Sequence, residues 1–118
     1  MSNYKISKTF EDRLSESNEI INKYPNRIPL IIEKLSNSND TIIPDIDKNK
    51  YLVPDDLTVG QLMYVIRKRL KLSPENAIFI FCNGNILNSN LTMRYIYNEY
   101  KDKDGFVYII YSGESTFG

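Results

Sequence analysis

Apolar residues recur at helical spacing in three segments of this chain, which predicts three helices. The predicted helices cover about residues 10–24, 58–72 and 93–100. Thr58 and Gln61 stand three residues apart at the start of the second segment, which is the pattern of a capping box. Pro25 follows the first segment, and we expect that helix to end there because the residue before a proline disfavours the helical conformation.

Four other segments are rich in β-branched and aromatic residues, which predicts four strands. The predicted strands cover residues 28–33, 50–54, 77–82 and 106–111. The strand at residues 50–54 is short and ends on Pro54, and proline cannot donate a hydrogen bond to a neighbouring strand. We therefore expect this strand to lie at an edge of the sheet. The Asn83–Gly84 pair after the third strand predicts a tight turn.

The order of these elements, apart from the first helix, is typical of a β-grasp, in which one helix crosses a mixed sheet, here of four strands. Three of the strands hardly alternate between apolar and polar residues, and strands of this kind need cover on both faces. The helix after Thr58 covers only one face. We therefore predict an α+β fold in which the N-terminal helix covers the second face. The residues expected to face the sheet are Phe10, Leu14, Ile21 and Tyr24, with Ser17 as a gap.

The chain has 118 residues, of which 42% are hydrophobic, and this suffices for one domain with its own core. We predict a single domain over residues 1–118. Its parts are a helical extension at residues 1–25, a β-grasp core at 26–111 and a polar tail at 112–118. Within the extension, residues 1–9 are polar and predict a loose arm or a short helix.

Composition excludes several kinds of chemistry. The 15 basic and 15 acidic residues balance, which argues against a general nucleic-acid-binding protein. The chain has no histidine, which excludes Ser-His and Cys-His catalysis and removes the commonest zinc ligand. Its single cysteine, Cys82, ends an apolar strand, so we expect a buried thiol in a reducing compartment. The carboxylates form no spaced pair for acid–base work. Composition therefore leaves only Asp, Glu, Lys and Tyr as acid–base groups, and no catalytic or metal site is recognisable.

The expected edge strand leaves one row of backbone groups unpaired, and an extended peptide can add to such an edge. Because side chains alternate along a strand, Lys50 and Leu52 should face the N-terminal helix, and Tyr51 and Val53 the capped helix. This predicts two pockets. The first is walled by Glu16, Ile20, Pro29, Lys50 and Leu52, and the second by Tyr51, Val53, Pro54, Leu57, Leu62 and Val65. The same residues could instead only fill a core, which is the more frequent origin of apolar periodicity.

Arg67, Lys68 and Arg69 form a basic run near the end of the capped helix. Basic side chains there complement the helix dipole, which is one reading of the run. The other is that Arg69, with Lys50 and Arg27, meets acidic residues of a partner peptide.

Several blocks of the chain resemble, in the same order, the autophagy ubiquitin-like modifiers. This is the family of yeast autophagy protein eight, GABA-receptor-associated protein and microtubule-associated light chain three. The blocks are Tyr24–Pro29, Lys50–Pro54, Asp56–Gln61, Ile66–Arg69, Lys101–Phe106 and Phe117–Gly118. The resemblance extends from about Phe10 to Gly118. It implies a ubiquitin-like β-grasp with added N-terminal helices, which agrees with the expectation of two covered faces.

The resemblance also implies conjugation. The terminal glycine would be activated by an ATP-dependent enzyme, passed through cysteines of the activating and conjugating enzymes, and joined to phosphatidylethanolamine. By position, Gly118 is the attachment residue, and Phe117 lies where the processing and delipidating protease reads the tail. No residue follows Gly118, which implies either that no proteolytic priming is needed or that this is a processed form. Since the sequence shows no signal peptide and no membrane span, we expect a cytoplasmic protein that its lipid anchors to autophagosomes and other vesicles.

The family binds aromatic-x-x-aliphatic motifs by strand addition, which implies that cargo receptors and adaptors dock on the two pockets. We call the first the aromatic pocket, to which Phe106 is added by position, and the second the aliphatic pocket. Arg27 and Arg69 are the implied charged contacts with the motif. A second docking surface is matched by Phe79, Ile80 and Phe81. Leu62 stands where many members have phenylalanine, and residues 36–44 look longer than usual.

Two other functions stay open at this point. One is an adaptor in vesicle traffic that uses the same peptide-binding surface and is never conjugated. The other is a modifier of proteins in place of lipid. For the conjugated modifier we expect a protein that is not an enzyme and has no metal or cofactor apart from the attached lipid. We also expect it to be a monomer in solution that binds no nucleic acid.

Overall fold

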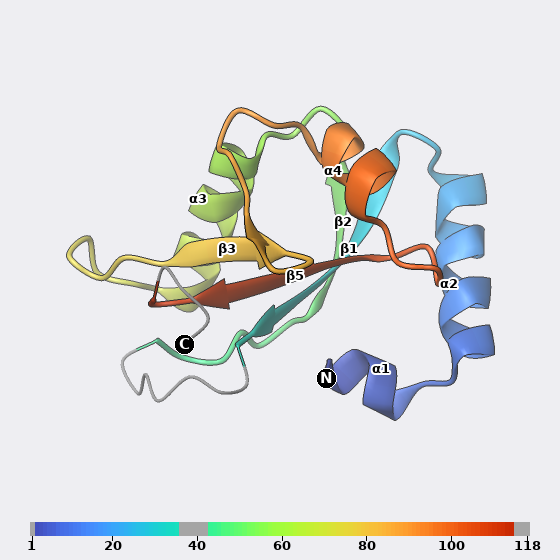
Figure 1. The fold of residues 1–118 in the computed structure, drawn as a ribbon, viewed down its shortest axis with the longest axis horizontal. Helices are drawn as coiled ribbons and strands as arrows, with labels where there is room; N and C mark the ends of the chain where they lie inside the picture. Colours follow the sequence, from blue (N-terminus) through green and yellow to red (C-terminus); the bar gives the residue numbers. More distant parts are fainter. Residues whose placement is uncertain (1, 36–42, 115–118) are drawn as a thin grey trace.

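The structure is a computed structural model that describes residues 2–35 and 43–114. These residues form four helices and five strands (Figure 1). In chain order they are α1 (Asn3–Ser7), α2 (Phe10–Lys23), β1 (Arg27–Lys34), β2 (Lys50–Pro54), α3 (Val59–Leu70), β3 (Phe79–Cys82), β4 (Asn85–Ile86), α4 (Met93–Tyr100) and β5 (Val107–Ser112). Of the described helices, none combines the length and the apolar character that crossing a bilayer requires.

The described strands form one mixed sheet in the order β2-β1-β5-β3-β4. β1 pairs antiparallel with β2 and parallel with β5, while β3 pairs antiparallel with β5 and with β4. Among the described residues, β2 therefore has a partner strand on one side only. The prediction that residues 50–54 form an edge strand is confirmed, with the same bounds.

The prediction of four strands was wrong by one short strand. β4 has two residues and returns along β3, with Asn85 opposite Cys82. The turn between them is formed by Asn83 and Gly84, whose φ angles of 51° and 79° are the left-handed values that a type I′ hairpin turn requires. A strand of two residues is too short to show a periodicity, so only its turn was visible in the sequence.

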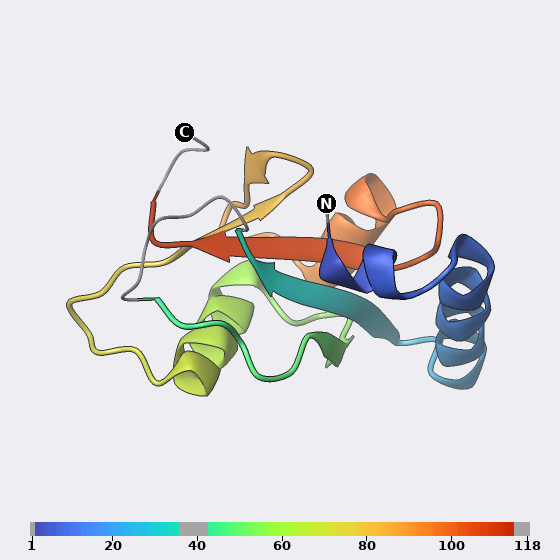
Figure 2. The same ribbon diagram turned by 90° about the horizontal axis from the view of Figure 1, so that it is seen from below.

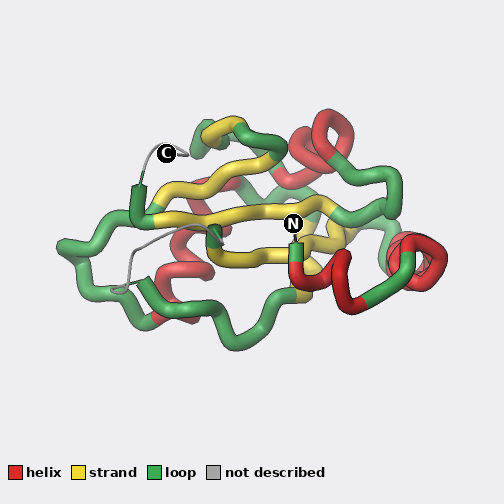
Figure 3. Tube along the Cα trace, turned by 60° about the horizontal axis from the view of Figure 1, so that its bottom comes forward, coloured by secondary structure: helices red, strands yellow, loops and turns green. Residues whose placement is uncertain are grey.

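The prediction that helices cover both faces of the sheet is confirmed, but α1 lies on the second face in place of the predicted helix at residues 10–24 (Figures 1 and 2). α3 and α4 lie on one face, α1 lies on the opposite face, and α2 stands beyond one end of the sheet (Figures 1 and 2). In Figure 3, α3 lies behind the strands and α1 in front of them. Along β1, Leu30 and Ile32 belong to the larger core, whereas Ile31 joins a smaller core with Tyr4 and Phe106. β1 is thus buried on both sides, which accounts for its continuous apolar sequence.

The expected buried face of the N-terminal helix was partly wrong. Phe10 and Tyr24 are 41% and 39% exposed, and the buried residues of α2 are Arg13 and Ser17. Arg13 Nε donates to the Asp104 carboxylate at 2.8 Å, and the Ser17 hydroxyl donates to the Asp104 carbonyl oxygen. Polar groups can be buried in this way when each finds a partner, and apolar periodicity cannot reveal such a face.

Ser17 lies at the closest approach of α2 to the turn that precedes β5. Gly105 in this turn has a φ of 90°, and a Cβ on it would collide with the Ser17 side chain. A small residue on the helix and a glycine in the turn are both needed for this contact. What appeared as a gap in the apolar face is therefore the point of contact.

Residues 3–7 form the short helix α1 and not a loose arm. The Ser2 hydroxyl accepts from the Lys5 N–H, and Glu33 of β1 accepts from the Tyr4 N–H at 3.1 Å. The Tyr4 side chain is only 4% exposed, and its ring packs edge-on against Phe106 with 5.4 Å between centroids. α1 is therefore a part of the fold that covers the second face.

The capping box of α3 is present in the structure. Thr58 N donates to Gln61 Oε1 at 2.9 Å, and Gln61 N donates to Thr58 Oγ1 at 3.2 Å. The helix ends at Leu70, two residues before the expected end, because Lys71 adopts the left-handed conformation with a φ of 56°. The strand predicted over residues 77–82 is also shorter and begins at Phe79.

Candidate functional site

The edge strand β2 presents its side chains alternately to the two faces of the sheet. Its pairing with β1 places Leu52 opposite Pro29 and Val53 opposite Ile28. Lys50 pairs with Glu16 of α2 on one face, whereas Val53 belongs to the larger core on the other. The residues of the two predicted pockets therefore lie on opposite faces of the same edge strand.

The residues of the predicted aromatic pocket come together from α2, β1, β2 and the turn before β5. Phe106 is fully buried and Pro29 is buried, so both lie at the base of this group. Ile20 packs against the smaller core. The partly exposed members, which a ligand can reach, are Glu16, Ile20, Lys50 and Leu52.

An ion pair between Glu16 and Lys50 connects the two sides of the aromatic pocket. Glu16 also accepts from the Tyr4 hydroxyl, and Lys8 Nζ lies 3.5 Å from its carboxylate. Burial alone would raise the pKa of Glu16, but the hydrogen bonds from Lys50 and Tyr4 hold that pKa below its usual range. The ammonium of Lys50 lies 5.7 Å from the Tyr4 ring centroid.

Tyr4 thus belongs to the aromatic pocket, and the sequence reasoning missed it. Burial and the hydrogen bond to Glu16 both raise the pKa of its hydroxyl, which therefore stays protonated as a donor. Two features of the sequence could have indicated it. Ser2 is a favoured N-cap residue, and Tyr4 is an aromatic residue in the largely polar segment that follows.

The residues of the predicted aliphatic pocket lie at different depths. Leu62 is 0% exposed and Val53 is 8% exposed, so both support the pocket from beneath. Tyr51 and Leu57 are half-buried, and the exposed members are Pro54 and Val65. The Tyr51 hydroxyl is buried without a hydrogen-bond partner among the described residues, and burial raises its pKa.

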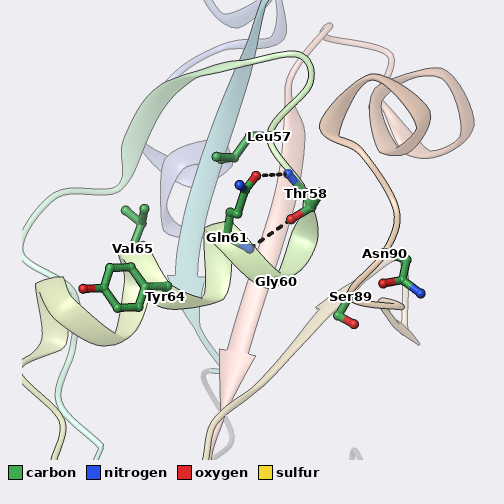
Figure 4. Close-up of a pocket in the computed structure, with 8 residues that line it drawn as sticks. All are labelled: Leu57, Thr58, Gly60, Gln61, Tyr64, Val65, Ser89 and Asn90. Carbon is green, nitrogen blue, oxygen red and sulfur yellow. Dashed lines mark hydrogen bonds between the residues drawn. The ribbon is translucent and has the colours of Figure 1, made fainter.

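A surface hollow of about 530 Å³ opens beside Leu57 and Val65 (Figure 4). Its remaining walls are Thr58, Gly60, Gln61, Tyr64, Ser89 and Asn90. Gly60 N donates to the Ser89 carbonyl at 3.0 Å, which holds the loop before α4 against the start of α3. The sequence reasoning did not find this hollow, because only the fold brings residues 89–90 next to α3.

The two expected charged contacts have different surroundings. Arg27 is exposed, and its guanidinium lies 5.9 Å from the Tyr24 ring centroid. Arg69 instead forms a two-pronged ion pair with Asp47, with Nε 2.8 Å from Oδ1 and Nη2 3.3 Å from Oδ2. The Arg69 guanidinium lowers the pKa of Asp47. This partner for Arg69 was not expected from the sequence.

The remaining candidate residues belong to the matched second docking surface and to the C-terminal tail. Ile80 and Phe81, of the matched second docking surface, are each only 2% exposed, while Phe79 is half-buried. Phe117 and Gly118 lie outside the described residues.

Cys82 is 1% exposed, and burial raises its pKa to about 12, so its thiol is protonated and shielded at neutral pH. The prediction of a buried thiol is confirmed. Within residues 2–35 and 43–114, no group of three or more His, Cys, Asp and Glu side chains is placed to hold a metal ion.

Comparison with known proteins places the chain in a family. A family model described as "Autophagy protein Atg8 ubiquitin like" matches residues 12–118. Autophagy-related protein 8a of Arabidopsis thaliana is 56% identical over 117 residues, which cover 99% of this chain and 93% of that protein. Autophagy-related protein 8 of Saccharomyces cerevisiae strain YJM789 is also 56% identical over 117 residues, which cover 99% of this chain and 97% of that protein.

Solved structures of high similarity lead to the same family. The crystal structure of Trypanosoma brucei ATG8 superimposes with a TM-score of 0.89 at 48% identity, covering 100% of this chain and 99% of that one. Plasmodium falciparum Atg8, solved in complex with a peptide of Plasmodium falciparum Atg3, gives a TM-score of 0.88 at 36% identity over 99% of this chain and 100% of that one. The expected ubiquitin-like β-grasp with N-terminal helices is confirmed, and the chain belongs to the Atg8 family of ubiquitin-like autophagy modifiers.

Proposed function

We propose that this chain is conjugated through Gly118 to phosphatidylethanolamine, and so carries its peptide-binding edge onto autophagic membranes. The single observation that carries the proposal is the family match, which continues through the tail to residue 118. Lipid conjugation is the known role of this family. The protein would be cytoplasmic before conjugation and lipid-anchored on autophagosomes and vesicles afterwards, without enzymatic activity or a separate cofactor.

A thioester assay tests the conjugation. A chain that ends at Gly118 is mixed with the activating enzyme and ATP and run on a non-reducing gel, where we expect a band shift that a thiol reductant removes. Gly118→Ala is the matched variant, and it should give no shift because its methyl group hinders the terminal carboxyl. The absence of a shift with the original chain, or an equal shift with Gly118→Ala, would refute the proposal. In the first case, an unconjugated adaptor becomes the better reading.

We also propose that the β2 edge binds aromatic-x-x-aliphatic motifs of cargo receptors, adaptors and the conjugating enzyme. One support is that β2 has a free edge flanked by the two pockets. Another is the Plasmodium falciparum relative, whose structure was solved with an Atg3 peptide. A peptide strand on β2 would place alternate side chains on the Lys50 and Leu52 face and on the Tyr51 and Leu57 face. Phe117 would be read by the processing protease in this scheme.

Calorimetry with a synthetic motif peptide tests the edge. Leu52→Ala and Lys50→Ala should each weaken binding by at least about fivefold if the two side chains are hot spots of the interface, because truncating a hot spot costs more than about 1 kcal/mol. Lys68→Ala is the control, since Lys68 is exposed on α3 and its ammonium lies 5.6 Å from the ring centroid of Tyr64, which is not among the predicted pocket residues. Unchanged affinity in both pocket variants would show that the peptide binds elsewhere.

A further inference from the structure

The Arg69 side chain forms an ion pair with Asp47 of the same chain. To bind an acidic residue of a motif peptide, its guanidinium would have to leave Asp47. Asp47 holds the guanidinium through two hydrogen bonds, of 2.8 Å and 3.3 Å, in the paired geometry that arginine and carboxylate prefer. An acidic residue of a bound peptide would seek the same face of the guanidinium. The following inference rests on the proposed peptide binding at the β2 edge.

Asp47 is held in position by the segment around it. The Pro44 carbonyl accepts from the Tyr111 hydroxyl at 2.8 Å, and Ile46 packs against the larger core. On the other side, the Asn49 carbonyl accepts from the Ile32 N–H at 2.7 Å. These anchors lie three residues before Asp47 and two residues after it, so the carboxylate meets Arg69 from a supported stretch of backbone.

The ion pair lies next to the aliphatic pocket. Arg69 and Asp47 act on the pKa of Tyr51 in opposite directions, the first lowering it and the second raising it, so both charges are near the phenol. Lys48, which follows Asp47, has its ammonium 5.4 Å from the centroid of the Tyr51 ring. Val65, another residue of that pocket, lies one helical turn before Arg69.

The pair is also open to exchange. The side chains of Arg69 and Asp47 are 42% and 70% exposed, so water and a second carboxylate can reach them. Exposed ion pairs contribute little to stability, which makes the exchange of one carboxylate for another inexpensive. We propose that Asp47 is a specificity-determining residue, an internal carboxylate that occupies Arg69 and that an acidic residue of the partner motif must displace.

The expected size of the effect follows from the exposure of the pair. An exposed ion pair contributes little, so its loss changes a binding constant by a factor of about 2–5 at most. Removing the Asp47 charge should therefore strengthen binding of acidic motifs by about this factor. Motifs without acidic residues should bind Asp47→Asn and the original chain equally well, because they gain nothing from a free Arg69.

The test uses isothermal titration calorimetry of the full chain with two synthetic peptides. One is an aromatic-x-x-aliphatic peptide with glutamate at both x positions and on both flanks, and the other carries glutamine at all those positions. Asp47→Asn should bind the glutamate peptide about 2–5 times more tightly and the glutamine peptide unchanged. In an Arg69→Gln background, Asp47→Asn should make no difference to either peptide.

Asp45→Asn is the matched control, because it removes the same charge from an exposed side chain two residues before Asp47. The hydrogen bonds that Arg69 donates in the described part of the chain go to Asp47. If Asp45→Asn and Asp47→Asn strengthened binding equally, the change in net charge would explain the effect, and the proposal would be overturned. An Asp47→Asn effect that persists without Arg69, or no effect at all, would also overturn it. If the original chain binds neither peptide, the peptide-binding edge itself is refuted, and the role of Asp47 is refuted with it.

Discussion

Asp104 is a charged residue inside the protein, where each carboxylate oxygen faces donors. Its side chain is 0% exposed, and it accepts from Arg13 Nε at 2.8 Å, from the Phe106 N–H at 2.9 Å and from the Tyr108 hydroxyl. Three donors converge on its two oxygens, and the Arg13 guanidinium among them supplies the opposite charge. This one side chain therefore connects α2, the turn before β5 and β5 itself.

Asp104→Asn should lower the free energy of unfolding by about 3 kcal/mol, because it turns an amide N–H₂ towards existing donors and leaves a buried charge unbalanced. Urea denaturation followed by circular dichroism measures the change. Asp56→Asn, at an exposed position, is the control and should stay within about 0.5 kcal/mol of the original chain. If the two variants had similar free energies of unfolding, the hydrogen bonds and the ion pair of Asp104 would make no net contribution to stability.

The helix α3 supports the aliphatic pocket and the adjoining hollow, so its first turn matters for both. The Thr58 and Gln61 pair closes that turn, and the Gly60 N–H is bonded to the Ser89 carbonyl at its outer side. These contacts set where Leu57 and Val65 lie relative to the loop before α4 (Figure 4). If α3 began one turn later, these contacts between its first turn and the loop before α4 would be lost.

Thr58→Ala should cost about 1 kcal/mol of folding free energy, because the first turn of α3 loses the oxygen that accepts from the Gln61 N–H. Thermal denaturation is the measurement, and Thr58→Ser is the control because it retains an accepting hydroxyl. The prediction fails if the alanine and serine variants melt at the same temperature.

At the scale of the whole molecule, ion pairs attach the N-terminal helices to the edge strand and to the loop before β5. Lys5 of α1 pairs with Asp102 at 2.6 Å, and Glu16 of α2 pairs with Lys50 of the edge strand. Burial works against ionisation of both carboxyls, but the hydrogen bonds from Lys50 and Tyr4 lower the pKa of Glu16, and the bond from Lys5 lowers that of Asp102. The second layer of the fold is therefore held partly by charge.

These lowered pKa values predict acid sensitivity. A carboxyl with a lower pKa in the folded state stabilises the protein above its ordinary pKa of about 4, and this contribution is lost as the pH falls through the folded value. The free energy of unfolding should therefore fall between about pH 5 and pH 3, and fall less steeply in Glu16→Gln. Urea denaturation at several pH values measures this, with Glu19→Gln on the exposed face of α2 as control. Parallel curves for Glu16→Gln and the original chain would contradict the prediction.

Much of the architecture was predictable because it rests on local signals. Pro54 marked the edge strand, Thr58 and Gln61 marked the start of α3, and the unbroken apolar strands indicated a sheet covered on both faces. Alternation along β2 placed Lys50 and Val53 on opposite faces, and the structure has Lys50 beside Glu16 of α2 and Val53 in the larger core. These features depend on neighbours along the chain, so the sequence alone determines them.

Contacts between distant segments were decided only by the tertiary structure. Arg13 and Ser17 meet Asp104, Tyr4 reaches Glu16 and Phe106, and Asp47 occupies Arg69, although nothing in the local sequence around these residues indicates the pairing. The physical reason is that polar partners are matched through space by distance and direction, which periodicity does not record. The sequence by itself determined that residues 50–54 form an edge strand with two faces. Only the tertiary structure decided that Glu16 pairs with Lys50 and that Asp47 pairs with Arg69.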